Sequence, residues 1–158
     1  MHEYYIVAFS NKKRDYYCIW TSDEGFITYE DKILLFDTIM KAKLYCHENQ
    51  MSVDDTEITR FYIDDIFNWC TSVKFDFDCD LLLNWWNILS DVYKSLGIYF
   101  DGDSIEKNDL YEKLFFGNNL PTINKSDKKY IPIFSKEEME VVKKLLIEGV
   151  NFLTEQFT

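Results

Sequence analysis

The sequence predicts an α+β protein in which an antiparallel β-sheet is packed against several helices. Aromatic and β-branched runs with hairpin signals dominate the first third of the chain, whereas helical periodicity and capping residues dominate the rest. Strands grouped apart from helices in this way are typical of α+β folds. With 158 residues, 47% of them hydrophobic, the chain fits a single domain, 1–158, with a core of its own.

Two runs at the start of the chain predict a β-hairpin. Residues 3–10 (EYYIVAFS) and 14–20 (RDYYCIW) favour strands, and the polar stretch NKK between them is a turn signal. Residues 25–30 (GFITYE) and 57–63 (EITRFYI) fit two further strands. These runs supply the predicted sheet.

The helical periodicity begins near residue 36. Asp37 is a candidate N-cap for a helix within 36–50, and Asp64 is a candidate N-cap for a second, short helix. The clearest helix covers 80–97, because Asp80 precedes its apolar run and Gly97 follows it, as capping residues do.

That helix is apolar over most of its circumference, and it contains the pair Trp85–Trp86. We therefore expect a central helix buried on more than one side, with both tryptophans in the core.

The last third predicts two more helices. One covers 105–117, and the other covers 135–157, where Ser135 followed by Glu138 forms a capping box. The piece 129–134 between them contains Pro132, so we expect it to be extended but at a sheet edge or outside a sheet.

The negative charge is concentrated in the middle of the chain. Residues 50–112 hold 14 acidic and four basic residues, a net charge of −10, while the whole chain carries −11. Such a field repels nucleic acid and anionic membrane surfaces and attracts basic proteins. A solvated acidic surface and a docking face for a positive partner both fit this distribution.

The location expected from the sequence is the cytoplasm. The N-terminal stretch lacks a secretory leader, and no run approaches the roughly 20 apolar residues that span a bilayer. The four cysteines form no C-x-x-C motif, so we expect reduced, mostly buried thiols.

The stretch FDFDCD, residues 75–80, raises the question of a metal site. A calcium loop needs glycine at position 6 and glutamate at position 12. Counted from Asp76, these positions are Leu81 and Asn87. The second acidic run, 101–112, fails at positions 5 and 6, so we expect no metal and no cofactor. An extended chain would instead place Asp76 and Asp78 on one outward row, with Asp80 capping the next helix.

Enzyme signatures are also missing from the sequence. Neither His2 nor His47 has a partner at metal-ligand spacing, and there is no G-x-S-x-G, P-loop or G-x-G-x-x-G motif. We expect no catalytic residues. A carboxylate-dependent hydrolase stays open as an alternative, and a cleft with two acids of oppositely shifted pKa would favour it.

The chain resembles the immunity proteins of contact-dependent growth inhibition systems. The resemblance lies in the N-terminal hairpin followed by LLFDTIMKAKLYC (34–46), in the tryptophan helix CDLLLNWWNILSDVY (79–93), and in the acidic, aromatic-rich character. It implies a bacterial protein that neutralises the C-terminal toxin domain of a CdiA-type protein by binding it and blocking its active site. That toxin domain is commonly a nuclease, and a ribonuclease is favoured here.

Nuclease domains are often basic, so an acidic inhibitor gains association rate by electrostatic steering, while a few apolar anchors supply affinity. Tyr62, Trp69 and Tyr111 are weighed as further anchors beside those in the partner-binding set. A small adaptor or a DNA mimic, with carboxylates spaced like phosphates, is the other alternative. The predicted partner-binding residues are Asp54, Asp55, Asp64, Asp65, Asp76, Asp78, Tyr99, Phe100, Asp101 and Asp103.

Overall fold

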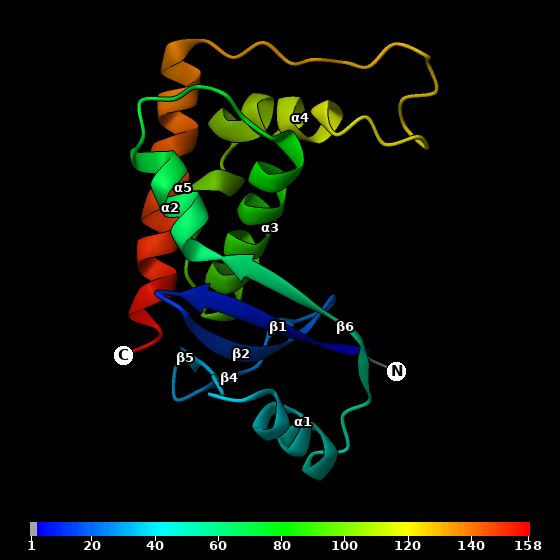
Figure 1. The fold of residues 1–158 in the computed structure, drawn as a ribbon, viewed down its shortest axis with the longest axis vertical. Helices are drawn as coiled ribbons and strands as arrows, with labels where there is room; N and C mark the ends of the chain where they lie inside the picture. The colour runs from blue at the N-terminus through cyan, green and yellow to red at the C-terminus, as the bar shows by residue number, and fades with distance from the viewer. Residues whose placement is uncertain (1–2) are drawn as a thin grey trace.

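A computed structural model describes residues 3–158, except for the side chains of residues 55–57. A four-stranded sheet lies with α1 on one face and with α2 to α5 gathered on the other (Figure 1). The sheet has the order β3-β2-β1-β6, from β3 (Gly25–Phe26), β2 (Arg14–Thr21), β1 (Tyr4–Asn11) and β6 (Val53–Tyr62). The short strands β4 (Thr28–Tyr29) and β5 (Lys32–Ile33) form a separate ribbon.

The helices follow in the order that the sequence predicts. Two 3₁₀ turns, η1 and η2, precede α4. The elements are α1 (Ile39–Glu48), α2 (Ile63–Thr71), α3 (Cys79–Ser95), η1 (Asp101–Asp103), η2 (Ile105–Lys107), α4 (Asn108–Gly117) and α5 (Lys136–Glu155). Residues 129–134 lie outside both sheets, as expected beside Pro132. The predicted α+β class, with an N-terminal hairpin and a long C-terminal helix, is confirmed.

The β1–β2 hairpin turns on Lys12 and Lys13, which have φ values of 52° and 64°. Asn11 pairs with Arg14, so the turn has two residues, both in the left-handed region. This turn geometry matches the right-handed twist of the paired strands. The hairpin is therefore tightly closed although neither turn residue is glycine or asparagine.

The pairing of β6 corrects the sequence-based expectation. Its backbone runs parallel to β1, from Tyr4 beside Val53 to Ser10 beside Tyr62, whereas β1, β2 and β3 are antiparallel. The chain between β1 and β6 contains α1, and a parallel neighbour requires such a crossover. The predicted single strand at 25–30 is likewise divided between β3 and β4, which belong to different sheets.

Three predicted N-caps are wrong. Thr38, not Asp37, caps α1 by accepting from the Lys41 amide, while Asp37 forms an ion pair of 2.8 Å with the Lys41 ammonium. The α3 cap is Asp78 instead of Asp80. Its Oδ1 accepts from the amides of Asp80 and Leu81, because the helix begins one residue before Asp80.

The cap predicted at Asp64 is the third error. In the described structure α2 follows β6 directly, with Tyr62 at the N-cap position and no capping side chain. Asp64 lies in the first turn, and its Oδ2 accepts a hydrogen bond of 2.9 Å from the Lys12 amide at the hairpin turn. Asp64 thus ties α2 to the hairpin.

The C-terminal end of α3 and the N-cap of α5 agree with the sequence-based prediction. Gly97 adopts φ 69°, its amide donates to Lys94, and the Ile98 amide donates to Tyr93, which is a Schellman motif. Ser135 and Glu138 form the predicted capping box of α5.

The core lies between the sheet and α3. Trp85 and Trp86 are each 1% exposed, and Phe9 of β1 packs on Trp85 with ring centroids 6.4 Å apart. At the far end of α5, the rings of Tyr16 and Phe157 stack at 4.0 Å. The C-terminal helix is therefore attached to the N-terminal hairpin, and α3 is the buried central helix that its sequence predicts.

Candidate functional site

The predicted acidic residues are spread over the molecule instead of forming one patch. Asp54 is near the start of β6 and Asp64 just beyond its end, about 30 Å away at ~3.3 Å per residue. Asp65 is exposed next to Asp64. Asp55 belongs to β6, but its side chain lies outside the described part of the chain.

Asp101 and Asp103 lie in η1, which packs against the middle of α3. Ser90 of α3 donates a hydrogen bond of 3.0 Å to Asp103. Since Ser90 follows Asp78 by 12 residues, η1 is displaced by about 18 Å along the helix from Asp78. Asp101 is partly neutralised by an ion pair of 3.1 Å with Lys107.

The two aromatic residues of the predicted set have opposite environments. Tyr99 is 69% exposed, whereas Phe100 is 3% exposed and packs on Tyr93 with centroids 5.0 Å apart. Phe100 is therefore a core residue, and its prediction as a contact residue is wrong. The sequence shows two adjacent aromatic residues after α3, but it does not show which of the two side chains points into the core.

The acidic segment that follows α2 lies beside a second segment that precedes α5. A pocket of about 460 Å³ lies between residues 77–80 and 129–132, and one of about 300 Å³ lies between Trp69 and Leu81. Phe77 and Asp78 line both pockets. We call this region the Asp78 surface, and its exposed residues are Asp76, Asp78, Asp80, Leu81, Lys129, Tyr130 and Ile131.

Apolar and acidic side chains are mixed on the Asp78 surface. Ile131 is 78% exposed, and Leu81 and Tyr130 are also exposed. Among the described residues, neither Asp76 nor Asp80 forms an ion pair with a lysine or arginine. Exposed apolar anchors with charged residues around them are typical of protein interfaces.

The segment 72–76 is fixed to the body by Lys143 of α5. This lysine is only 7% exposed, and its Nζ donates to the carbonyl oxygens of Ser72, at 2.9 Å, and Lys74. The ammonium also lies 4.8 Å from the ring centroid of Trp69 and 5.0 Å from that of Phe75. Carbonyl dipoles and aromatic faces therefore stabilise this buried charge without a carboxylate.

A second contact fixes the backbone of Asp76. The indole Nε1 of Trp69 donates a hydrogen bond of 2.7 Å to the Asp76 carbonyl oxygen. Trp69, weighed as an anchor for a partner, thus acts as an internal support of this segment. Together, Trp69 and Lys143 hold the backbone of residues 72–76 in one arrangement.

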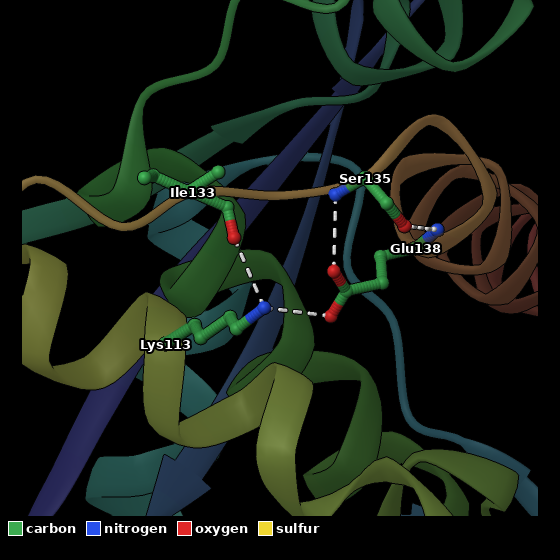
Figure 2. A network of polar contacts seen from close by, with 4 residues as sticks. All are labelled: Lys113, Ile133, Ser135 and Glu138. Atoms are coloured by element: carbon green, nitrogen blue, oxygen red, sulfur yellow. Dashed lines mark hydrogen bonds and ion pairs between the residues drawn. The ribbon is translucent and has the colours of Figure 1, made fainter.

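The neighbouring segment is held by the network in Figure 2. Lys113 of α4 donates from Nζ to the Ile133 carbonyl oxygen, at 3.0 Å, and to Glu138 Oε2, at 2.8 Å. Glu138 Oε1 accepts from the Ser135 amide as part of the capping box. The hydrogen bond from Lys113, followed by that from Ser135, lowers the pKa of the Glu138 carboxyl.

The two segments also contact each other directly. The rings of Phe77 and Phe134 pack edge to face with centroids 4.9 Å apart. A Cβ on Gly117 at the end of α4 would approach the Cys79 sulfur to 2.5 Å and Pro132 Cγ to 3.0 Å. Gly117 is thus needed for close packing of α4 against both segments.

The described side chains do not form a metal site. No group of three or more His, Cys, Asp and Glu side chains within the described residues is placed to hold a metal ion. Burial raises the pKa of the Cys70 thiol to about 12 and also raises that of Cys18, so both thiols are protonated at neutral pH. All four cysteines are free.

One carboxyl outside the Asp78 surface has a raised pKa. Asp91 is half buried, and burial is the main cause, while a hydrogen bond of 2.9 Å from the Trp20 indole opposes the shift. Asp103 adds to the increase through its negative charge. The acids with lowered pKa, Asp15, Asp37 and Glu138, have partners elsewhere, Arg60, Lys41 and Lys113. The described structure therefore offers no cleft with two oppositely shifted acids.

Lys143 is one of the residues of this site that the sequence analysis missed, together with Leu81, Lys113, Tyr130 and Ile131. The pair KK at 143–144 suggests a solvated helix face, but Lys143 follows Met139 by four residues and precedes Leu146 by three. It therefore falls on the apolar stripe of α5, and this spacing is the signal of its burial.

Among the described helices, none combines the length and the apolar character needed to cross a membrane. Comparisons of the chain with known protein families, with curated proteins and with solved structures find no match. The function is therefore argued from the Asp78 surface and the charge of the chain.

Proposed function

We propose that this protein is a cytoplasmic immunity protein that neutralises the basic C-terminal toxin domain of a contact-dependent growth inhibition system. The observation that carries the proposal is the Asp78 surface, where Asp76 and Asp80 lie unpaired among the described residues beside the exposed Leu81, Tyr130 and Ile131.

Electrostatics supports a basic partner. The net charge of −11 steers positive proteins toward the chain. Because Asp76 and Asp80 have no ion pair to break within the described part of the chain, they can pair directly with cations of a partner. The apolar side chains between them would provide the anchors that determine the dissociation rate.

A nuclease toxin fits this chemistry, and a ribonuclease is the favoured kind. Nucleases bind phosphates through lysine and arginine, and the same cations would contact the carboxylates of the Asp78 surface. Occupation of that cationic track would exclude the nucleic acid and block the active site.

The rigid support of the surface is a further argument. Lys143, Trp69 and Lys113 fix the backbone of both segments in the free protein. A preordered surface loses less conformational freedom on binding, which favours high affinity.

The test compares two matched double charge reversals. The first is Asp76→Lys/Asp80→Lys, which leaves the N-cap Asp78 intact, and the second is Asp101→Lys/Asp103→Lys in η1. Each variant is co-purified with the toxin domain encoded next to this protein, and its association rate is measured. We expect the first variant to associate at least about tenfold more slowly and the second much less affected.

Equal binding by the first variant and the parent, with protection of cells retained, would show that the toxin uses another face. A DNA mimic, by contrast, requires the whole row of carboxylates, so both variants would lose binding to a similar extent.

A further inference from the structure

The segment between α4 and α5 extends away from the body of the protein (Figure 1). We call residues 118–134 the arm. Its backbone is ordered by two asparagine side chains. Asn119 bonds to both backbone groups of Tyr130, at 2.9 Å and 2.6 Å, and Asn124 bonds to Asn119 and to the Lys128 carbonyl. The arm is thus a defined structure with its own polar network.

The arm presents apolar side chains around a pocket. This arm pocket has a volume of about 540 Å³, and two lysines, Lys128 and Lys129, contribute to its wall. The remaining lining is mainly apolar, from Phe115, Phe116, Leu120, Ile123 and Tyr130, with Asn124. A pocket with apolar walls and cationic side chains suits an apolar residue that has carboxylates beside it.

The charge of the arm is opposite to that of the segment 72–81. The arm contains three lysines and one aspartate, a net charge of +2, whereas residues 72–81 contain one lysine and three aspartates, a net charge of −2. Residues 72–81 also expose apolar side chains, with Val73 at 89% and Phe75 and Leu81 partly exposed. The chain therefore carries both halves of a complementary contact.

We propose that two copies of this chain form a dimer in which the arm pocket of each copy receives segment 73–81 of the other. Lys128 and Lys129 would face Asp76 and Asp80 of the second copy, and the exposed apolar side chains would fill the pocket.

The geometry suits a twofold arrangement. Asp78 and Lys129 line the same pocket within one molecule, so the acidic segment and the arm are neighbours. A twofold axis at their boundary makes two identical contacts and leaves no complementary surface free, which closes the assembly at two copies. Repulsion between the net charges is screened beyond about 8 Å at physiological ionic strength, whereas the facing charges are in contact.

The dimer covers the Asp78 surface, so a second copy would compete with the toxin. Only this consequence rests on the proposed function, because dimer formation itself needs no toxin.

The test is sedimentation of the full chain, without partner, over a wide range of concentration. The expected result is a reversible monomer–dimer equilibrium that weakens with added salt. Lys128→Glu/Lys129→Glu and Asp76→Lys/Asp80→Lys should each raise the dissociation constant at least about tenfold, because both contacts become repulsive. Lys125→Glu is the matched control, since it changes the charge of the arm outside the pocket.

Mixing the two double variants gives the decisive result. In a heterodimer the glutamates introduced in the arm of one copy face the lysines introduced in the segment of the other. The second contact keeps the parent lysines and aspartates. Both contacts are therefore attractive again, and dimers should return. A monomer at all concentrations, or a mixture that stays monomeric, would overturn the proposal. The proposed function is judged separately with Lys128→Glu alone, because Lys128 lines the arm pocket but not the Asp78 surface, so this variant should dimerise less and still bind the toxin.

Discussion

The buried Lys143 of α5 and the half-buried Trp69 of α2 form a cation–π pair, with the ammonium 4.8 Å from the ring centroid. The same ammonium donates to the carbonyl of Ser72, which ends α2, at 2.9 Å. The favourable interaction of a cation with the C-terminal end of a helix adds to this contact. The pair links the long C-terminal helix to the segment that carries Asp76 and Asp78.

Lys143→Met should therefore loosen this segment. The methionine keeps most of the apolar contact but leaves the partly buried carbonyl oxygens of Ser72 and Lys74 without their donor, at a cost of about 1 kcal/mol in unfolding free energy. Hydrogen exchange of residues 72–76 should accelerate. Lys144→Met, at the exposed neighbouring position, is the control and should stay within about ±0.5 kcal/mol. Unchanged exchange in the Lys143 variant would show that other contacts hold the segment.

The N-cap of α3 can be tested with three substitutions. Asp78→Ala should lower the unfolding free energy by about 1 kcal/mol, because the amides of Asp80 and Leu81 lose their acceptor. Asp78→Asn should remain near the parent, since asparagine caps as well as aspartate. Asp80→Ala should cost less than Asp78→Ala in urea unfolding. A larger loss of unfolding free energy in Asp80→Ala than in Asp78→Ala would show that Asp80 is the cap.

Trp85 and Trp86 are expected to be structural. Each is 1% exposed, so truncation to alanine should cost about 3–5 kcal/mol through lost burial and a residual cavity. Tyr99→Ala, at an exposed position, should leave the unfolding free energy almost unchanged. A stably folded tryptophan variant with impaired partner binding would instead assign that ring to an interface.

The lowered pKa of the Glu138 carboxyl predicts that the stability of the protein depends on pH. Because this pKa is lowered in the folded protein, the contribution of the carboxyl is present above the unfolded value and is lost as pH falls through the folded value. Glu138→Gln should lower the melting temperature at pH 7, where Lys113 loses its charged partner. The difference from the parent should shrink as the pH falls below the ordinary glutamate pKa of about 4.3, and it should be lost once the pH is below the lowered folded value. A difference that is constant with pH would contradict this account.

Calcium and chelators should leave the melting temperature unchanged. Residues 101–112 form η1, η2 and the start of α4, so they do not form a loop that encircles an ion. Asp78 is engaged with the amides at the start of α3. A saturable stabilisation by calcium, measured by differential scanning fluorimetry, would disprove the prediction.

Local patterns predicted the hairpin, α3 and α5, because their information lies within the element itself. Periodicity with Gly97 predicted α3, periodicity with the Ser135 capping box predicted α5, and the polar stretch NKK between β-rich runs predicted the hairpin. The sequence analysis placed the cap of α3 at Asp80, two residues after the observed cap Asp78, so the exact start of the helix was missed. Such boundaries depend on one or two hydrogen bonds that the sequence pattern does not rank.

Contacts between residues far apart in the chain could not be predicted from the sequence. The parallel neighbour of β1 depends on the path of the chain through α1, and the burial of Phe100 depends on how the chain packs after α3. The candidate site combines residues around 78 with residues around 131, and only the fold brings these together. The sequence did indicate the acidic half of the site, but not its apolar half or its lysine support.

The stacking of Tyr16 on Phe157 has a consequence for folding during synthesis. The hairpin can close as soon as its own residues leave the ribosome, but α5, which covers one end of it, is made more than a hundred residues later. Until then the Tyr16 ring lacks the Phe157 ring that stacks on it, and apolar side chains left exposed in this way attract chaperones and promote aggregation. The yield of native protein should therefore depend on how fast translation reaches α5.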